Sequence, residues 1–202
     1  MNLDQAMLPL LILVPVFTGL LIAMAPEKSA KGIATLGTLI AVAVYAVAAM
    51  RFTGWVDGGP RLSFYYEWFK PLGLKVDLAV DSVSMLLIGL TVLLGPICVI
   101  GSYTAITERL RTYYAWLLIL QGAMTGVFCA RDVILFYIFF EFTLIPMYVL
   151  INLYGSTNRK AAATKFFLYT FTGSIITLAG LVFVAYRHAS MSGGGGTFDL
   201  ST

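Results

Sequence analysis

The sequence is poor in charged residues, which make up only 11% of its 202 residues, while hydrophobic residues make up 59%. A soluble globular domain carries about 25% charged residues. So few charges cannot cover a surface that faces water, and the composition therefore indicates a protein whose solvent is lipid. Thirteen Lys and Arg stand against ten Asp and Glu. The resulting net charge of +3 is too small and too dispersed to suggest nucleic-acid binding.

Residues that carry metal, redox or hydrolytic chemistry are equally scarce. The only cysteines, Cys98 and Cys129, lie in apolar segments without a CxxC or Cys/His pattern, which argues against a metal site or a disulfide framework. The single histidine, His188, is interpreted as an interfacial polar group at a helix end. The glycines at 193–196 follow no strand and lack the Lys-Ser/Thr of a phosphate loop, which predicts a flexible linker. Of the functions expected for a membrane protein, the movement of ions or protons is the one that these absences leave open.

Six apolar stretches are long enough to cross a hydrocarbon core, which takes about 20 helical residues. The predicted helices cover 7–24, 32–50, 80–103, 113–130, 133–154 and 161–186. Continuous apolar character favours helices, because barrel strands would alternate. The first stretch lacks the basic start of a signal peptide and is followed at once by another span, so we expect a true helix. The sequence therefore predicts an all-α integral membrane protein, with one transmembrane region over 1–202.

The loops predict how these helices are oriented. Three short loops carry pairs of basic residues, and an alternating topology puts them on one side of the membrane: Lys28 and Lys31, Arg109 and Arg111, and Arg159 and Lys160. The positive-inside rule makes that side cytoplasmic and leaves the N-terminus outside, as expected for a bacterial inner membrane. Residues 51–79 are predicted to form an extramembrane loop. Its aromatic residues at 64–69 are expected to form an interfacial belt rather than a ligand cage. A second loop is predicted at 187–202.

Glu141 is the strongest candidate for proton handling, because it lies near the middle of the fifth predicted span. An ionised carboxylate at that depth costs a few kcal/mol, so intramembrane acids are usually functional. Burial favours the protonated form and a nearby cation favours the ionised one. A group between these two influences can take up and release a proton near neutral pH. The alternative is a structural glutamate that is protonated or hydrogen-bonded.

Pro146 and Lys165 are the supporting candidates. Proline has no N–H, so Pro146 leaves the carbonyl of Phe142 without its helical partner and creates a place for water beside Glu141. A plain packing kink is the alternative. Lys165 lies about one turn into the sixth span, where it either takes part in proton transfer or extends to the interface. Asp81 and Asp132 lie at helix starts, which predicts capping.

The residues around Glu141 resemble a known family. The run at 126–148, with its core Phe140-Glu141-Phe142-Thr143-Leu144-Ile145-Pro146-Met147-Tyr148, is similar to subunit M (chain 4) of proton-pumping NADH-quinone oxidoreductase, complex I. Residues 78–84, 162–170 and 196–200 resemble the same antiporter-like subunits. The resemblance covers essentially the whole chain.

The resemblance implies a fold of fourteen helices with two inverted five-helix repeats, of which this chain would supply the N-terminal portion. It implies that Glu141 pairs with a lysine on a seventh helix, which the sequence does not reach. We therefore expect an N-terminal fragment, from a partial gene, a frameshift or a split subunit. The neighbours implied are the L- and N-type membrane-arm subunits. The chain itself is expected to bind no cofactor, because NADH, FMN, iron–sulfur clusters and quinone would bind to partner subunits.

Three hypotheses follow. The first is a membrane-arm subunit of respiratory complex I that contributes to proton translocation coupled to electron transfer from NADH to quinone. The complex would then be the enzyme, a proton-translocating NADH:quinone oxidoreductase, and the chain would do no redox chemistry itself. The second is a subunit of an Mrp-type cation/proton antiporter. The third is a non-catalytic fragment of such a subunit.

Overall fold

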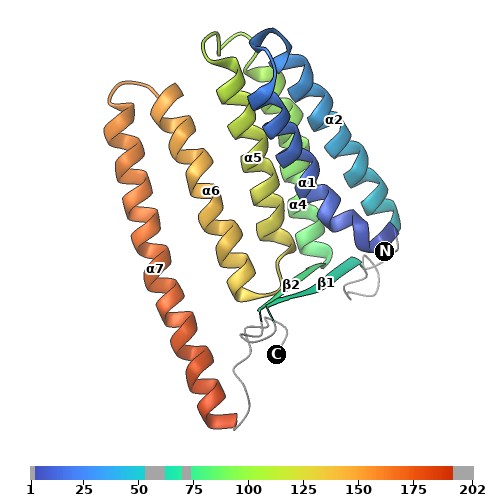
Figure 1. Cartoon of the computed structure of the whole chain (residues 1–202), viewed down its shortest axis with the longest axis vertical. Coiled ribbons are helices and arrows are strands. Elements are labelled where there is room, and N and C mark those ends of the chain that lie inside the picture. Colours follow the sequence, from blue (N-terminus) through green and yellow to red (C-terminus); the bar gives the residue numbers. More distant parts are fainter. Residues whose placement is uncertain (1–2, 53–61, 70–73, 193–202) are drawn as a thin grey trace.

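Six long helices run up and down through the structure (Figure 1), a computed structural model that describes residues 3–52, 62–69 and 74–192. Each is long and apolar enough to cross a membrane. They are α1 (Leu3–Met24), α2 (Glu27–Arg51), α4 (Ser82–Gly101), α5 (Leu110–Cys129), α6 (Val133–Tyr154) and α7 (Arg159–Ser192). The three loops with basic pairs lie at one end of the molecule, as the alternation predicts. The prediction of an all-α membrane protein with six spanning helices is confirmed.

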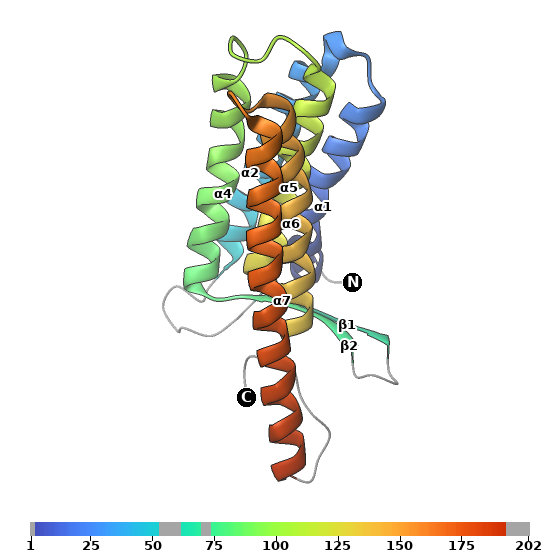
Figure 2. The same ribbon diagram turned by 90° about the vertical axis from the view of Figure 1, so that its left-hand side faces the viewer.

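Four helices extend beyond their predicted bounds, namely α1, α2, α5 and α7, and the extension is largest at the start of α2 and the end of α7. The predicted bounds follow the apolar residues, whereas a helical backbone can continue through charged ones. Helix α2 begins at Glu27 instead of 32, directly after Pro26, and Glu27 in the first turn suits the helix dipole. Helix α7 continues to Ser192, so the loop predicted at 187–202 was wrong as far as Ser192, and His188 lies within this helix. Figure 2 shows this last part of α7 extending past the other helices. The glycines at 193–196 lie outside the described residues.

The segment predicted as a loop at 51–79 contains a β-hairpin, and this corrects the sequence interpretation. Strand β1 (Leu62–Phe69) pairs antiparallel with β2 (Leu74–Val80). Leu62 lies opposite Val80 and both are buried, while Ser63 is exposed, Phe64 is half-buried against the core and Tyr65 is 57% exposed. Residues 62–65 therefore alternate with the period of two that is typical of a half-buried strand, and the next residue, Tyr66, is exposed as well. The glycines and prolines of the segment exclude a long helix but are equally compatible with a hairpin.

The hairpin forms backbone contacts with the residues that directly precede α6. The N–H of Arg131 donates to the carbonyl of Asp77 at 3.0 Å, and Leu78 forms an isolated bridge with Ala130. Directly after this connection, Asp132 caps α6 by accepting from the N–H groups of Ile134 and Leu135. The hairpin thereby fixes where α6 enters the bundle.

Both predicted caps are confirmed. Asp132 is buried and acts as described at α6, while the exposed Asp81 accepts from the N–H of Ser84 at 2.7 Å to cap α4. That hydrogen bond lowers the pKa of Asp81 below its ordinary value. Each cap satisfies N–H groups that the first helical turn leaves unpaired.

Among the described residues, helices α1 and α5 make the most extensive contact of any helix pair, and two glycines lie in it. A Cβ atom at Gly19 would lie 2.7 Å from the carbonyl oxygen of Ala115. A Cβ atom at Gly122 would lie 2.8 Å from the carbonyl oxygen of Ile12. Each glycine therefore faces the backbone of the other helix, which is how small residues allow membrane helices to approach. Around this contact α1, α2, α4 and α5 make the core, and α6 and α7 form a layer beside α5 (Figure 1).

We expect Gly122→Ala to lower the free energy of unfolding by about 1–3 kcal/mol, because the added methyl group overpacks the contact between α1 and α5. Thermal unfolding in detergent measures the effect. Gly32→Ala is the matched control: a Cβ atom there meets nothing within 4 Å. It should be neutral or stabilising, since alanine favours a helix over glycine. Equal destabilisation by the two substitutions would contradict the close contact.

Candidate functional site

Glu141 lies in the first half of α6, half-buried and on the side that meets α7. The hydroxyl of Ser174 on α7 donates to its Oε1. Ser174 is only 7% exposed, although most of α7 is exposed around it. The same hydroxyl lies 2.8 Å from the carbonyl of Phe171, one turn earlier on its own helix. The carboxyl group is thus bound across the interface between two helices.

A second hydroxyl lies beside this pair. Tyr137 precedes Glu141 by four residues, so both side chains lie on one face of α6. Its hydroxyl lies near both Glu141 and Ser174. Within the described part of the chain this buried oxygen has no hydrogen-bond partner. Glu141, Ser174 and Tyr137 therefore form a cluster of one carboxyl and two hydroxyl groups inside a membrane span.

Sequence reasoning missed both hydroxyl residues, for different reasons. Tyr137 was available from the four-residue spacing, which places it next to Glu141 on the helix. Ser174 was not, because the pairing of α6 with α7 depends on how their side chains pack. The ring of Tyr148 meets that of Phe167 with centroids 5.8 Å apart, and this register brings Ser174 to the level of Glu141.

The structure places Lys165 away from the cluster. Lys165 is exposed, and it precedes Ser174 by nine residues on α7. At 1.5 Å per residue this is about 13 Å along the helix axis. Lys165 and Glu141 therefore do not lie together, whereas Pro146 is buried five residues beyond Glu141 in α6. The roles expected for Lys165 and Pro146 stay predictions.

The electrostatic surroundings of Glu141 are neutral. Among residues 3–52, 62–69 and 74–192, its hydrogen bond comes from an uncharged hydroxyl, and the basic residues of α5 and α7 lie near the helix ends. Within that same part of the chain, no three His, Cys, Asp or Glu residues gather to hold a metal ion. In a span, an ionised carboxylate without a cation is costly. The hydroxyl groups beside Glu141 are therefore the polar surroundings that the described residues give its carboxyl group.

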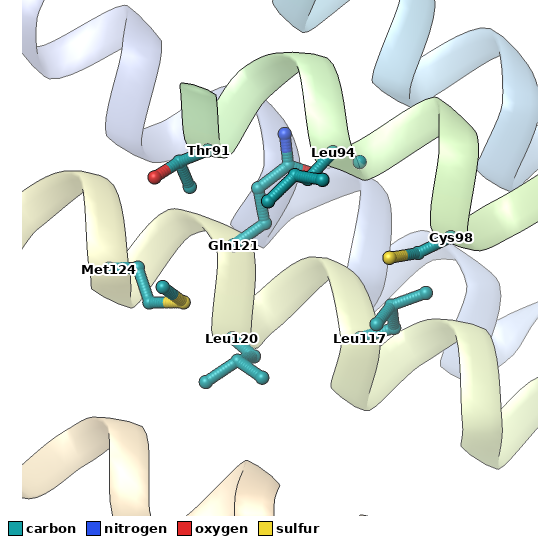
Figure 3. A pocket seen from close by; sticks show the side chains of 8 residues that line it. Thr91, Leu94, Cys98, Leu117, Leu120, Gln121 and Met124 are labelled. Atoms are coloured by element: carbon teal, nitrogen blue, oxygen red, sulfur yellow. The ribbon is translucent and has the colours of Figure 1, made fainter. Parts of the chain in front are cut away.

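A separate apolar hollow of about 160 Å³ lies between α4 and α5 (Figure 3). Leucine side chains, Cys98 and Met124 make up most of its lining, and the amide of Gln121 lies against it. Gln121 is 6% exposed, and within the described residues its amide nitrogen has no hydrogen-bond partner. The hollow shares no lining residue with the Glu141 cluster and offers no carboxylate or cation. It is not part of the candidate proton site.

Comparison with known proteins supports the resemblance stated from the sequence. Residues 130–192, which contain the whole cluster, match the family described as NADH:quinone oxidoreductase/Mrp antiporter, TM. NADH-quinone oxidoreductase subunit M of Rhodobacter capsulatus is 36% identical over 158 residues, which is 78% of this chain and 30% of that protein. F(420)H(2) dehydrogenase subunit M of Methanosarcina mazei is 34% identical over 195 residues, which is 95% of this chain and 38% of that protein.

The fold agrees with these sequence matches. A chain of respiratory complex I from Thermus thermophilus superimposes with a TM-score of 0.74 at 28% identity, over 96% of this chain and 38% of that one. The resemblance to antiporter-like membrane subunits is confirmed. The chain spans about a third of the length of these relatives, which fits an N-terminal portion of their fold.

We expect Ser174→Ala to weaken the attachment of α7 to α6, because it removes the hydrogen bond to Glu141. Interhelical hydrogen bonds in membranes contribute about 0.6–1.7 kcal/mol, so the loss of unfolding free energy should fall in that range. Denaturant unfolding in mixed micelles measures it. Thr177→Ala is the control, since that hydroxyl donates to Gly173 on its own helix. An equal loss of unfolding free energy in both variants would show that the bond between the helices adds no more stability than a bond within one helix.

Proposed function

We propose that this chain, whose sequence and fold resemble antiporter-like membrane subunits, acts within the membrane arm of a respiratory complex I. There it would contribute to proton translocation coupled to electron transfer from NADH to quinone. The observation that carries the proposal is the Glu141 carboxyl group, held inside a span by the hydroxyl of Ser174. The names of the matched relatives supply the coupling reaction, which is proposed for this chain by similarity.

In the proposed mechanism Glu141 takes up and releases a proton, and the hydroxyl groups adjust to its state. Ser174 donates to Glu141 when the carboxyl is ionised. When it is protonated, the carboxyl O–H can itself donate to a neighbouring oxygen, and Tyr137 supplies one beside it. Two hydroxyl groups can thus satisfy both states, because a hydroxyl both donates and accepts. A cation brought near Glu141 would favour the ionised form and drive the release of the proton.

We propose that the chain itself performs no electron transfer. The enzyme would be the whole complex, with NADH, FMN, iron–sulfur clusters and quinone bound by partner subunits. The L- and N-type antiporter-like subunits are the proposed neighbours. The three loops with basic pairs would face the cytoplasm of a bacterial cell, which puts the N-terminus on the outside. Their position at one end of the bundle supports this orientation.

A subunit of an Mrp-type cation/proton antiporter is the second candidate, because the matching family includes both kinds of protein. The two functions differ in what drives the proton. In complex I it moves when an electron donor is oxidised, whereas in an antiporter it moves against a cation gradient without any donor. Glu141 would carry a proton in either case, so the driving force has to be tested separately.

We expect Glu141→Gln to reduce proton pumping by the assembled complex to a small fraction of the wild-type value. Glutamine keeps the size of the side chain and can still accept from Ser174, but it cannot exchange a proton. Inverted membrane vesicles with NADH as donor and a pH-sensitive dye measure the change. Pumping that stays unchanged would refute the role of Glu141.

The control is Glu27→Gln, which removes an exposed carboxylate in the first turn of α2 and should leave pumping intact. A sodium gradient imposed on the same vesicles without NADH distinguishes the second candidate. Acidification or alkalinisation that depends on sodium and Glu141 would favour the antiporter over complex I.

A further inference from the structure

A polar hollow of about 300 Å³ lies at the end of the bundle that carries the basic loops. Two segments far apart in the sequence line it. The first is the connection between α4 and α5, at 105–109, and the second is the turn between α6 and α7, with Leu153, Tyr154 and Arg159. The charged groups in its lining are Arg109, Arg159 and Glu108. The hollow shares none of its lining residues with the Glu141 cluster.

Both unusual backbone conformations of the described chain occur at this hollow. Among residues 3–52, 62–69 and 74–192, the non-glycine residues with positive φ are Arg109 at 51° and Asn158 at 62°. Arg109 lines the hollow, and Asn158 directly precedes Arg159, the other arginine. A left-handed conformation is uncommon for arginine and costs of the order of 1 kcal/mol. The backbone conformation of Arg109 sets the direction of its own side chain, and that of Asn158 sets the position of the next residue, Arg159.

Hydrogen bonds hold these two segments in place. The hydroxyl of Tyr154 donates to the carbonyl of Arg109 at 2.7 Å. One terminal nitrogen of Arg159 donates to the carbonyl of Leu153 at 2.8 Å. These bonds use the backbone of Arg109 and one donor of Arg159. In the described part of the chain neither guanidinium forms an ion pair, so most of their five N–H donors remain available.

We infer that this hollow binds the phosphate group of an anionic phospholipid. Two guanidinium groups from separate segments can approach the oxygens of one phosphate, and planar guanidinium is well suited to bidentate phosphate binding. Arg109 directly precedes α5, and Arg159 is the first residue of α7. Both therefore lie at the ends of membrane spans, at the depth of lipid headgroups. Basic pockets between helices at the cytoplasmic side of membrane proteins bind such headgroups.

The depth of the site favours a lipid phosphate over free phosphate. Ile106 and Leu153 also line the hollow and offer an apolar boundary next to the arginines. Apolar contact benefits the glycerol and acyl portions of a lipid, and inorganic phosphate gains nothing from it. Glu108 opposes any anion, so its replacement by glutamine should strengthen binding. The proposal does not depend on the function proposed for Glu141.

The experiment measures lipid retained by the full chain. The protein is purified from liposomes that contain equal amounts of phosphatidylglycerol and phosphatidylethanolamine, and native mass spectrometry counts the molecules that remain bound. Each arginine near a membrane surface contributes about fivefold to the binding of an anionic lipid. We expect Arg109→Gly and Arg159→Gln each to lower retention of phosphatidylglycerol about fivefold, and the pair to lower it about thirtyfold. Retention of phosphatidylethanolamine should not change.

Two matched controls distinguish lipid binding in the hollow from a general effect of positive charge and from a loss of folding. Arg111→Gln removes a basic residue at the same end that does not line the hollow, and it should leave retention unchanged. Asn158→Gly relieves the second left-handed residue while keeping both arginines, and it should also retain the lipid. Arg109→Gly relieves its own strain, so an unchanged or higher unfolding temperature confirms that this variant is folded.

Three results would overturn the proposal. The first is equal retention by the double variant and the wild type. The second is an equal loss with Arg111→Gln, which would indicate a diffuse charge effect. The third is displacement of phosphatidylglycerol by inorganic phosphate added in large excess over the protein, since that would identify the occupant as a soluble anion.

Discussion

Lipid offers no hydrogen-bond partner, and this constraint governs how the hydroxyl groups of the spanning helices are satisfied. Most hydroxyl groups satisfy it locally. Thr91 donates to the carbonyl of Leu87, Thr125 to that of Gln121, and Thr170 to that of Phe166, each four residues earlier on the same helix. A helix that satisfies its own hydroxyl groups can then pack through apolar and small residues, as α1 and α5 do at Gly19 and Gly122.

Some hydroxyl groups also reach a side chain beyond their own helix: Thr35 meets the hydroxyl of Tyr103, and Ser102 meets that of Tyr114. The bond from Ser174 to Glu141 differs from these in its acceptor, which is a carboxyl group. A carboxyl group is the most demanding polar group in the spans, and it cannot be satisfied by the backbone of its own helix alone. Its position consequently depends on the register of two helices. Packing and chemistry are coupled here: a shift of α7 along α6 would remove the donor from the carboxyl group that needs it.

The sequence predicts much of this fold because a helix that crosses lipid must be long and continuously apolar, and both properties are visible in the sequence. Span length and continuous apolar character identify six helices, and the aspartates at 81 and 132 identify two of their starts. The hairpin at β1 and β2 escaped prediction because aromatic residues near a membrane are typical of its interface, and this signal outweighs the short alternation of the strands. Within the site, Glu141 was found from its depth and charge alone. Ser174 required the packing of α6 on α7, and no spacing within the sequence contains that information.

Helix α6 is held by specific contacts at both of its ends. Only Leu144 and Pro146 are buried along its length. At its start, the backbone of Arg131 is bound to the hairpin and Asp132 caps the first turn. At its end, Tyr154 binds the carbonyl of Arg109 and packs its ring against Tyr113, with centroids 5.0 Å apart. A helix fixed at both ends holds Glu141 at the level where Ser174 of α7 reaches its carboxyl group, and Phe139, two residues earlier in the chain, packs against Gly126 of α5.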